Sequence, residues 1–265
     1  SMFAASTHDD LLCFTDGGRA FSIKVFELPE TGRTAKGRPI INFINLKNGE
    51  RICAYLPIKG LGKSHTFLNF ISENGLIKRA ALRQYANINK GGVVAVKVKN
   101  GDRIVTVLPS KGIDDLLLVT HLGMSIRFSE LEVRIGGRQS SGVTGIKIGN
   151  NDKVVGGIVV PMKFDKDGDT ITSENGLTMM TFSTRGFGKR TNVDEYLVSP
   201  VDGGKLRQQS RGGKGRIDMN IEKKTGNCSG VIPVRNGKDI VIITKQGQMV
   251  RIPGDSIKTT YRGTS

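Results

Sequence analysis

Basic side chains stand beside glycines at regular intervals along this chain of 265 residues, a combination that suits the binding of phosphate groups. A glycine has no Cβ, so its backbone N–H can approach a phosphate oxygen while a neighbouring Lys or Arg supplies positive charge. A first phrase, made of a turn glycine, a few apolar residues and a basic residue, occurs at residues 18–24, 75–79, 123–127, 186–190 and 247–251. A second phrase, made of basic or small polar residues with glycine, occurs at residues 33–37, 87–91, 138–142, 210–215 and 261–263.

The glycines of the second phrase have a purely structural alternative, namely that they only permit tight turns where a strand begins. At Gly142, which has no charged neighbour, we give the two interpretations equal weight. Residues 207–216 contain four basic side chains and no acidic one, which favours phosphate binding there. The run Gly212–Arg216 does not fit the GxxxxGK[ST] pattern, so the sequence argues against a nucleotide-binding P-loop.

The charge balance favours an anionic partner. The chain contains 40 Lys and Arg residues against 24 Asp and Glu residues, a formal net charge of +16. Such a surplus indicates nucleic acid or an acidic membrane, with nucleic acid favoured, and no apolar run is long enough to predict a membrane span. The chain has no Trp and only four Tyr. Since single-strand binders stack bases on aromatic rings, we expect double-stranded nucleic acid, bound through its phosphates.

No set of residues has a spacing that suits catalysis or metal binding. Cys13, Cys53 and Cys228 form no CxxC pair and are expected as free, mostly buried thiols, and the three histidines are far apart. The acidic run at residues 165–169 resembles a calcium loop, but the glycine and glutamate of an EF-hand do not fall at the right places. A hairpin tip is the favoured interpretation. We therefore expect no catalytic residue, no metal and no cofactor in this chain.

The elements that carry the two phrases are predicted to be β-hairpins. In the clearest copy an apolar strand at residues 66–72 is followed by Glu-Asn-Gly and a return strand at residues 76–80. Asn-Gly between such strands is a strong hairpin signal. Equivalent opening strands are expected at residues 11–15, 116–120, 179–183 and 240–244. The copies recur roughly every 50–60 residues, the size of a propeller blade.

The expected fold is therefore all-β, a single domain over residues 1–265 whose blade-like repeats share one core. We place the repeats at roughly residues 1–60, 61–110, 111–161, 162–236 and 237–265, the last of them partial. No helix is expected beyond a turn at residues 129–133, and residues 197–209 are expected to form an extra-long loop. Ile41 and Val94 are expected in apolar strands, so that Asp at either position would unfold a blade.

Several stretches together resemble one known family. They are residues 7–14, 18–19, 25–30 and 33–37, Gly-Phe-Gly-Lys-Arg-Thr at residues 186–191 ahead of a Glu-Tyr pair, and Arg-Gly-Gly-Lys-Gly at residues 211–215. The combination resembles the C-terminal domain of DNA gyrase A, from the type IIA topoisomerases, over essentially the whole chain. The resemblance implies a β-pinwheel, a six-bladed β-propeller variant whose blades exchange strands. It also implies a basic rim that binds, bends and wraps double-stranded DNA, so that the whole enzyme introduces negative supercoils.

Two features depart from the family pattern. The family's glutamine-led basic box lies in its first blade, whereas the only similar sequence here, Gln209–Gly215, is in the fourth repeat. The chain also stops where the family pattern has a further strand. We interpret the chain as five hairpin units of a six-bladed pinwheel that is incomplete at both ends or lacks a blade. DNA binding is expected, with less complete wrapping.

The expected DNA-binding residues are the basic side chains of the two phrases and of their flanks. They are Arg33, Lys36, Arg38, Lys78, Arg79, Lys90, Arg127, Arg138, Lys189, Arg190, Arg207, Arg211, Lys214, Arg216, Arg251 and Arg262. The resemblance implies that ATP and Mg²⁺ act through other regions of the whole enzyme. It implies gyrase B and the N-terminal part of gyrase A as partners, in the bacterial cytoplasm at the nucleoid, with a plastid as the alternative location. The rival interpretations are the C-terminal domain of topoisomerase IV and a basic propeller scaffold for protein partners.

Overall fold

The computed structural model describes residues 3–32, 35–60, 65–164, 171–173, 176–199, 204–244 and 247–264. Within these ranges every regular element is a β-strand or a short 3-10 helix, so the all-β prediction is confirmed. No helix in the described ranges is long and apolar enough to cross a membrane. The chain divides into two compact units, which we call unit 1 (Ser1–Gly112 with Val133–Val143) and unit 2 (Ile113–Glu132 with Thr144–Ser265). A single domain over the whole chain stays a prediction.

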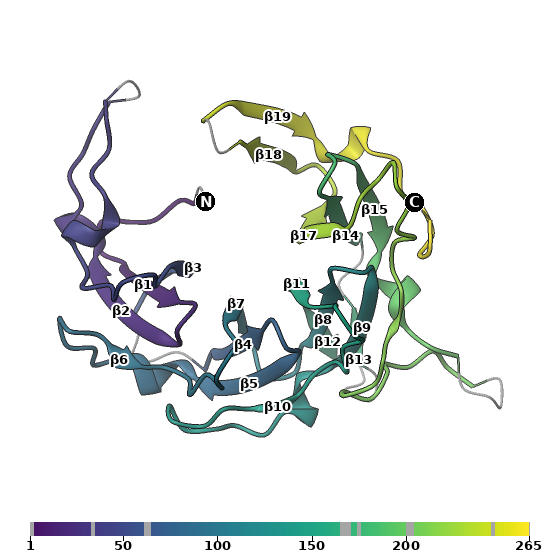
Figure 1. Cartoon of the computed structure of the whole chain (residues 1–265), viewed down its shortest axis with the longest axis horizontal. Helices are drawn as coiled ribbons and strands as arrows, with labels where there is room; N and C mark the ends of the chain where they lie inside the picture. The colour runs from purple at the N-terminus through teal and green to yellow at the C-terminus, as the bar shows by residue number, and fades with distance from the viewer. Residues whose placement is uncertain are drawn as a thin grey trace. The chain divides into compact units, whose positions relative to one another are not determined.

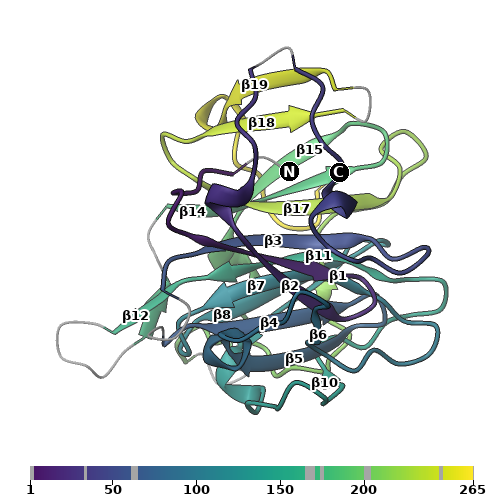
Figure 2. The same ribbon diagram turned by 90° about the vertical axis from the view of Figure 1, so that its left-hand side faces the viewer.

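The first sheet of unit 1 combines a hairpin with two strands from farther along the chain. Its order is β3-β1-β2-β6, as Figures 1 and 2 show for β1 (Asp10–Thr15), β2 (Arg19–Lys24), β3 (Ile52–Ile58) and β6 (Val93–Val94). Strand β6 belongs to the second repeat, yet it pairs antiparallel with β2, with Arg19 opposite Val94. One repeat therefore completes the sheet of the repeat before it, which is the strand exchange that the resemblance implied.

The second sheet of unit 1 has the same design. Its order is β10-β5-β4-β7, formed by β4 (Phe67–Ser72), β5 (Leu76–Ala81), β7 (Ile104–Ser110) and β10 (Val143–Thr144). Strand β10 comes from the third repeat and lies at the division between the units. Its first residue, Val143, ends the segment Val133–Val143 that belongs to unit 1.

Unit 2 begins with a third sheet of this kind. Its order is β11-β8-β9-β16, formed by β8 (Asp115–Thr120), β9 (Met124–Ser129), β11 (Val154–Val160) and β16 (Arg216–Ile217). A smaller sheet, β15-β14-β17, contains β14 (Leu177–Ser183), β15 (Gly188–Asn192) and β17 (Cys228–Arg235). Two pairs complete the described strands, β12 (Met162–Phe164) with β13 (Ile171–Ser173), and β18 (Asp239–Ile243) with β19 (Met249–Pro253).

Short 3-10 helices connect the strands. They are η1 (Val25–Glu27), η2 (Ile40–Asn42), η3 (Leu82–Tyr85), η4 (Glu130–Glu132), η5 (Val193–Tyr196) and η6 (Gly254–Ser256). The turn predicted at residues 129–133 corresponds to η4. The first residues of η5 and η6 accept hydrogen bonds from buried arginines.

The opening strand of each hairpin is its most buried part, as in β8, where all six residues are buried. The predicted opening strands correspond to β1, β4, β8, β14 and β18. In unit 1 the rings of Phe14, Phe70 and Tyr85 lie at the centre of the core, with Phe14 and Phe70 edge to face at 5.4 Å between centroids. In unit 2 the core includes Met179 and Tyr196.

Two residues that the sequence placed in the core lie on the surface. Ile41 is 58% exposed in η2, and Val94 is 51% exposed in β6. The expectation that Asp at either position unfolds a blade is therefore wrong. Apolar neighbours suggested interior strands, but η2 is a single turn and β6 is a two-residue strand at the edge of its sheet.

The loop predicted at residues 197–209 carries a β-bridge of its own. The backbone N–H of Val198 donates to the oxygen of Arg207 at 2.8 Å, and that of Arg207 donates back at 2.9 Å. Residues 200–203 of this loop lie outside the described residues, as does the acidic run at residues 165–169, which falls between β12 and β13.

The three cysteines are free thiols, as predicted. Cys13 and Cys228 are buried and Cys53 is partly buried. Burial raises the pKa of each thiol to about 12. Because the thiolate is the reactive form, none of them is set up as a nucleophile near neutral pH.

Candidate nucleic-acid interface

The basic residues of the first phrase lie on the return strand of each hairpin, and most of them are buried. The fourth residue after the turn glycine is Arg79 in β5, Arg127 in β9 and Arg190 in β15. These side chains are 6%, 1% and 6% exposed. A buried guanidinium needs partners, because an unpaired charge in the interior is costly.

The guanidinium of Arg127 is held both by its own hairpin and by the following repeat. Its Nε donates to Oδ2 of Asp115 at 2.8 Å, and that carboxylate is as deeply buried as the guanidinium. Its Nη1 donates at 2.9 Å to the backbone oxygen of Val193, the first residue of η5, and at 3.1 Å to Oδ1 of Asp194. Desolvation raises the pKa of Asp115, and the charge of Arg127 opposes that shift. Arg127 therefore ties its hairpin to the 3-10 helix of the following repeat.

Arg190 repeats this arrangement one hairpin later. Its Nη1 donates to the backbone oxygen of Gly254, the first residue of η6, at 2.6 Å and to Oδ1 of Asp255 at 3.3 Å. In unit 1 the guanidinium of Arg79 lies over the ring of Phe67, 5.1 Å from its centroid. Arg127 and Arg190 thus link their hairpins to the following repeat, and Arg79 packs against an aromatic ring of its own hairpin.

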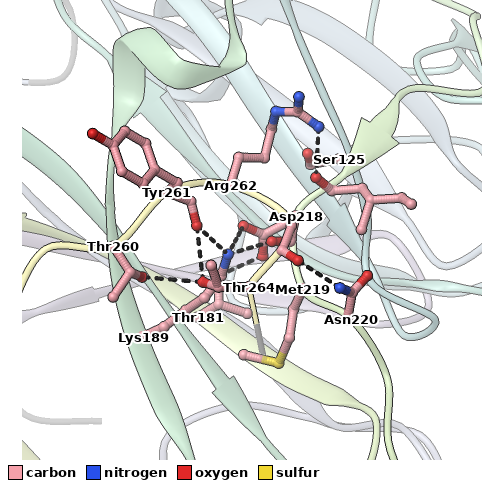
Figure 3. Close-up of polar contacts among 12 residues, drawn as sticks. Ser125, Thr181, Lys189, Asp218, Met219, Asn220, Thr260, Tyr261, Arg262 and Thr264 are labelled. Atoms are coloured by element: carbon pink, nitrogen blue, oxygen red, sulfur yellow. Dashed lines mark hydrogen bonds and ion pairs between the residues drawn. The ribbon is translucent and has the colours of Figure 1, made fainter.

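The third residue after the turn glycine is a buried lysine in two repeats, at Lys78 and Lys189. Figure 3 shows Lys189 in a polar cluster around Asp218, a fully buried carboxylate. The Nζ of Lys189 lies 3.3 Å from Oδ1 of Asp218 and donates to the backbone oxygens of Asp218 and Tyr261. Thr181 donates to Oδ2 of the same carboxylate at 2.8 Å. The charge of Lys189 is therefore neutralised inside the protein.

Five of the expected DNA-binding residues do not present their charge to solvent, and we remove them from the exposed surface of the candidate interface. They are Lys78, Arg79, Arg127, Lys189 and Arg190, none more than 6% exposed. The physical reason is that the next repeat covers the return strands on which they lie. A loop backbone N–H donates to the carbonyl oxygen of each of the three arginines, in the pairs Gly136 with Arg79, Gln209 with Arg127, and Thr260 with Arg190.

These covering segments run directly into the second phrase, because their donors stand one or two residues before residues 138–142, 210–215 and 261–263. We call each stretch, from its donor onward, a second-phrase loop, and these loops bring basic residues to equivalent positions. The three N–H···O distances are 2.8, 2.9 and 2.8 Å. Each acceptor is the fourth residue after its turn glycine, so each loop crosses its strand at the same place. Two residues beyond each donor stands an arginine, at Arg138, Arg211 and Arg262. Within unit 2, Arg211 and Arg262 therefore stand at equivalent positions on successive hairpins, and Arg138 stands at the corresponding position on its hairpin in unit 1.

Most of the remaining candidates are accessible. Exposed side chains are those of Lys36, Arg38, Lys90, Arg138, Arg207, Lys214 and Arg251, and half-buried ones are those of Arg211, Arg216 and Arg262. Arg251 is paired with Asp239, whose Oδ2 accepts from its Nε at 2.6 Å. Arg33 lies outside the described residues.

The half-buried arginines are held by backbone carbonyl oxygens. Arg216 donates from Nη1 to the oxygen of Leu197 at 2.9 Å, and Arg262 donates from Nη1 to the oxygen of Ile217 at 2.9 Å. Neutral acceptors fix the position of a guanidinium without cancelling its charge. Burial, and then the charge of Arg262, lower the pKa of Arg216, and the charge of Glu195 opposes that shift.

Two exposed lysines that the sequence reasoning missed extend this surface. Lys97 and Lys147 follow β6 and β10, the strands supplied to the preceding sheet. The N–H of Lys97 donates to the oxygen of Ser140 at 3.2 Å, and that of Lys147 to the oxygen of Gly213 at 2.8 Å. Each lysine therefore lies beside the second-phrase loop of the next repeat. The signal was the pattern Ala-Val-Lys-Val and Gly-Ile-Lys-Ile after two of the three supplied strands, β6 and β10.

In two of these loops the last glycine, Gly142 or Gly215, is required by the conformation of the backbone. Gly142 has φ +87°, and a Cβ there would lie 2.3 Å from the carbonyl oxygen of Ile77. Gly215 has φ +77°, and its Cβ would lie 2.3 Å from the oxygen of Ser125. Only glycine lets the loop approach the neighbouring strand so closely. The structural interpretation accounts for both glycines, and phosphate binding then depends on the cations.

We expect Gly215→Ala to destabilise the protein and Gly213→Ala, in the same loop, to leave its stability unchanged. The alanine at position 215 combines a strained φ with a backbone clash, which should lower the free energy of unfolding by about 1–3 kcal/mol. At Gly213 a Cβ meets no atom closer than 3.6 Å. Chemical denaturation measures the difference. Equal stability, with duplex affinity lost only in Gly215→Ala, would instead make that glycine a phosphate ligand.

Comparisons of the sequence with known proteins agree with one another. A family model described as the DNA gyrase C-terminal domain, beta-propeller, matches residues 9–53, 69–111, 114–161, 178–199, 201–235 and 238–265. The DNA gyrase A protein of Helicobacter pylori is 36% identical over 267 residues, covering 100% of this chain and 30% of that protein. The chain spans less than a third of the length of such curated relatives.

Solved structures share the fold. The chain is similar to the C-terminal domain of DNA topoisomerase IV, with a TM-score of 0.78, 24% identity, and coverage of 98% of this chain and 74% of that one. It is also similar to a DNA gyrase A C-terminal domain, with a TM-score of 0.76, 21% identity, and coverage of 98% and 77%. Both likenesses concern the fold, which agrees with the β-propeller of the family model.

Proposed function

Because this chain belongs to the DNA gyrase C-terminal domain family, we propose that it binds double-stranded DNA on its second-phrase loops and bends the duplex along them. The observation that carries the proposal is the recurrence of exposed or half-buried cations at equivalent positions in successive repeats. A protein that bends DNA must offer phosphate contacts at several points, since these contacts offset the bending energy.

The contacts are to phosphates rather than to base edges. Lys90, Arg138 and Lys214 are exposed on loops, where side chains of this kind reach the sugar–phosphate backbone. Lys97 and Lys147 add charge beside the same loops. Binding of this kind carries little sequence preference, so we expect duplexes of different sequence to bind alike.

At the level of the whole protein, this domain wraps DNA so that strand passage elsewhere introduces negative supercoils. We assign ATP, Mg²⁺, the N-terminal part of gyrase A and the gyrase B protein to those other regions. This assignment is supported by relatives that are DNA gyrase A proteins and of which this chain spans less than a third.

Duplex affinity should fall steeply with salt. If the loops neutralise roughly six to ten phosphates, affinity should fall by about 10³–10⁵-fold between 50 and 200 mM monovalent salt, because each contact releases counterions. Fluorescence anisotropy with labelled random-sequence duplexes measures this slope. A shallow slope together with one strongly preferred sequence would contradict phosphate binding. Absence of duplex binding, with tight binding to an acidic protein surface, would favour the protein scaffold instead.

A further inference from the structure

A hollow of about 540 Å³ lies in unit 1 beside the second-phrase loop of the third repeat. It is lined by most of the loop at residues 136–142, by Ile77 and Lys78 of β5, and by Lys97 and Arg134. Among the described residues that line it, none is acidic, whereas another hollow of unit 1, of about 600 Å³, has three carboxylates in its lining. The first hollow offers cations, serine hydroxyls and backbone N–H groups, which are the donors that hold phosphate.

Lys78 is the buried cation of this hollow, only 2% exposed. Its Nζ donates to the backbone oxygens of Ala95 at 2.7 Å and Arg138 at 2.8 Å, and it lies 5.6 Å from the ring centroid of Phe70. An ammonium has three N–H donors, so one is left for a further acceptor. Within the described part of the chain, no carboxylate is paired with Lys78.

The equivalent lysine of unit 2 shows what Lys78 lacks. Lys189 also stands third after its turn glycine and also donates to the loop of the next repeat, but its charge is paired with Asp218. Ala95 occupies the place of Asp218 in unit 1. Each of these two residues donates its backbone N–H to the carbonyl oxygen of the turn glycine in the preceding repeat, at 2.8 and 2.7 Å. Lys78 is therefore the copy without a counter-anion.

Two tyrosines show the same difference. The hydroxyl of Tyr196 donates to Oδ1 of Asp218 at 2.5 Å. The hydroxyl of Tyr85 donates to the backbone oxygen of Ala95 at 3.0 Å, because no carboxylate stands there. The lysine and the tyrosine correspond in the two repeats, but Thr181, which stands opposite Lys189 and donates to Asp218, is replaced by Phe70 opposite Lys78. Unit 1 therefore lacks the negative charge that lies beside Lys189.

The charged groups that share this hollow with Lys78 are all positive, whereas a much smaller hollow that Lys78 also lines contains Asp102 beside Lys97 and Lys99. Burial, and then the charge of Arg138 on the covering loop, lower the pKa of Lys78 to about 8. Lys97 and Arg134 line the same hollow, and the hydroxyl of Tyr85, the other titratable group at this place, is a neutral donor. Burying an ammonium without an anion is costly, so an anion in the hollow would be bound favourably.

We propose that this hollow is a phosphate site, in which Lys97 and Arg134 hold one phosphodiester of bound duplex and Lys78 supplies the buried counter-charge. The proposal rests on the function proposed above and adds to it a fixed point of attachment. In unit 2 the internal pairing of Lys189 with Asp218 removes the charge that such a site needs. The loops are therefore not equivalent in how they hold DNA.

Occupation of the site should favour the charged form of Lys78 and raise its pKa. By linkage, a rise of one unit in that pKa means that the protonated protein binds duplex about tenfold more tightly than the deprotonated protein. Between roughly pH 7 and pH 10, the duplex affinity of the wild-type protein should accordingly fall by about tenfold or more. This fall is counted beyond any fall that Lys78→Met shows over the same pH range.

The direct test is the titration of the Lys78 ammonium by side-chain NMR, assigned with Lys78→Met. It is followed in the free chain, with saturating random-sequence duplex, and with inorganic phosphate against chloride at equal ionic strength. We expect duplex and phosphate to raise the pKa by about one unit or more, and chloride to leave it unchanged. Tight, salt-dependent duplex binding without a change in this pKa would overturn the site and leave the proposed function intact. A shift with phosphate but no binding of duplex would overturn the proposed function and the DNA origin of the phosphate.

Because Lys78→Met removes buried hydrogen bonds and can fail to fold, a surface pair provides the second test. Lys97→Ala with Arg134→Ala removes the outer cations, and Arg51→Ala with Lys59→Ala removes two exposed cations of unit 1 that do not line the hollow. We expect the first pair to lose the phosphate-induced shift and the pH-dependent part of duplex affinity, and the control pair to keep both. Equal losses in the two pairs would mean that only total charge matters and would overturn the site.

Discussion

Replacement of Arg127 by Met should destabilise the protein strongly without removing a DNA contact. The change leaves Asp115 buried without its guanidinium, and breaking a buried ion pair on one side costs about 3–5 kcal/mol. That loss is a large share of the roughly 5–15 kcal/mol by which native proteins are stable. The hydrogen bond to Val193, which ties one repeat to the next, is lost as well. Chemical denaturation followed by circular dichroism measures the change.

Arg138→Met is the matched control, since it removes the same charge from an exposed loop position. We expect its stability to stay within about 0.5 kcal/mol of the wild-type value, while its duplex affinity falls. The assignment of Arg127 to the fold would be contradicted if Arg127→Met kept wild-type stability and lost duplex affinity.

Neutralising one exposed cation in each of three second-phrase loops should produce the largest loss of duplex affinity among the variants described. For Lys90→Ala, Arg138→Ala and Lys214→Ala combined, the slope of log affinity against log salt should become shallower by about 2.7, because each phosphate contact contributes about 0.9. Stability should change little, since these side chains are exposed. Anisotropy titrations over a series of salt concentrations measure the slope.

The control for total charge replaces Lys59, Lys163 and Lys238 by Ala, three exposed cations outside the second-phrase loops. We expect this variant to keep nearly the wild-type slope. If both triple variants lost the same part of the slope, net charge rather than the loops would determine binding. If the loop variant instead melted far below the control, those loops would be structural.

The hairpins and their order could be predicted from the sequence because the signals are local. A turn glycine between apolar runs indicates a hairpin wherever it occurs, and the opening strands followed from that pattern. The exposure of the cations could not be predicted in this way. Lys78 and Arg79 are neighbours on β5 whose side chains should alternate between faces, yet both are buried, because a loop from the next repeat covers them.

The same non-local packing explains the other errors. Val94 lies in an apolar run, but it is exposed because its strand is a short edge strand supplied to another repeat. Ala95 and Asp218 are recognised as equivalent residues only in the structure, where the backbone N–H of each donates to the turn glycine of the preceding repeat. Lys97 and Lys147 carried a readable repeat signal, and only the structure showed that they lie beside the basic loops.

Bending of the duplex tests the central claim most directly. A duplex of about 40 base pairs is much shorter than the persistence length of about 150 base pairs, so it is nearly straight when unbound. With dyes at its two ends, energy transfer should rise when the protein saturates it, and the rise should be smaller for the variant that lacks Lys90, Arg138 and Lys214. Unchanged transfer at saturation, verified by anisotropy on the same sample, would mean that the protein holds DNA straight and would contradict bending along the loops.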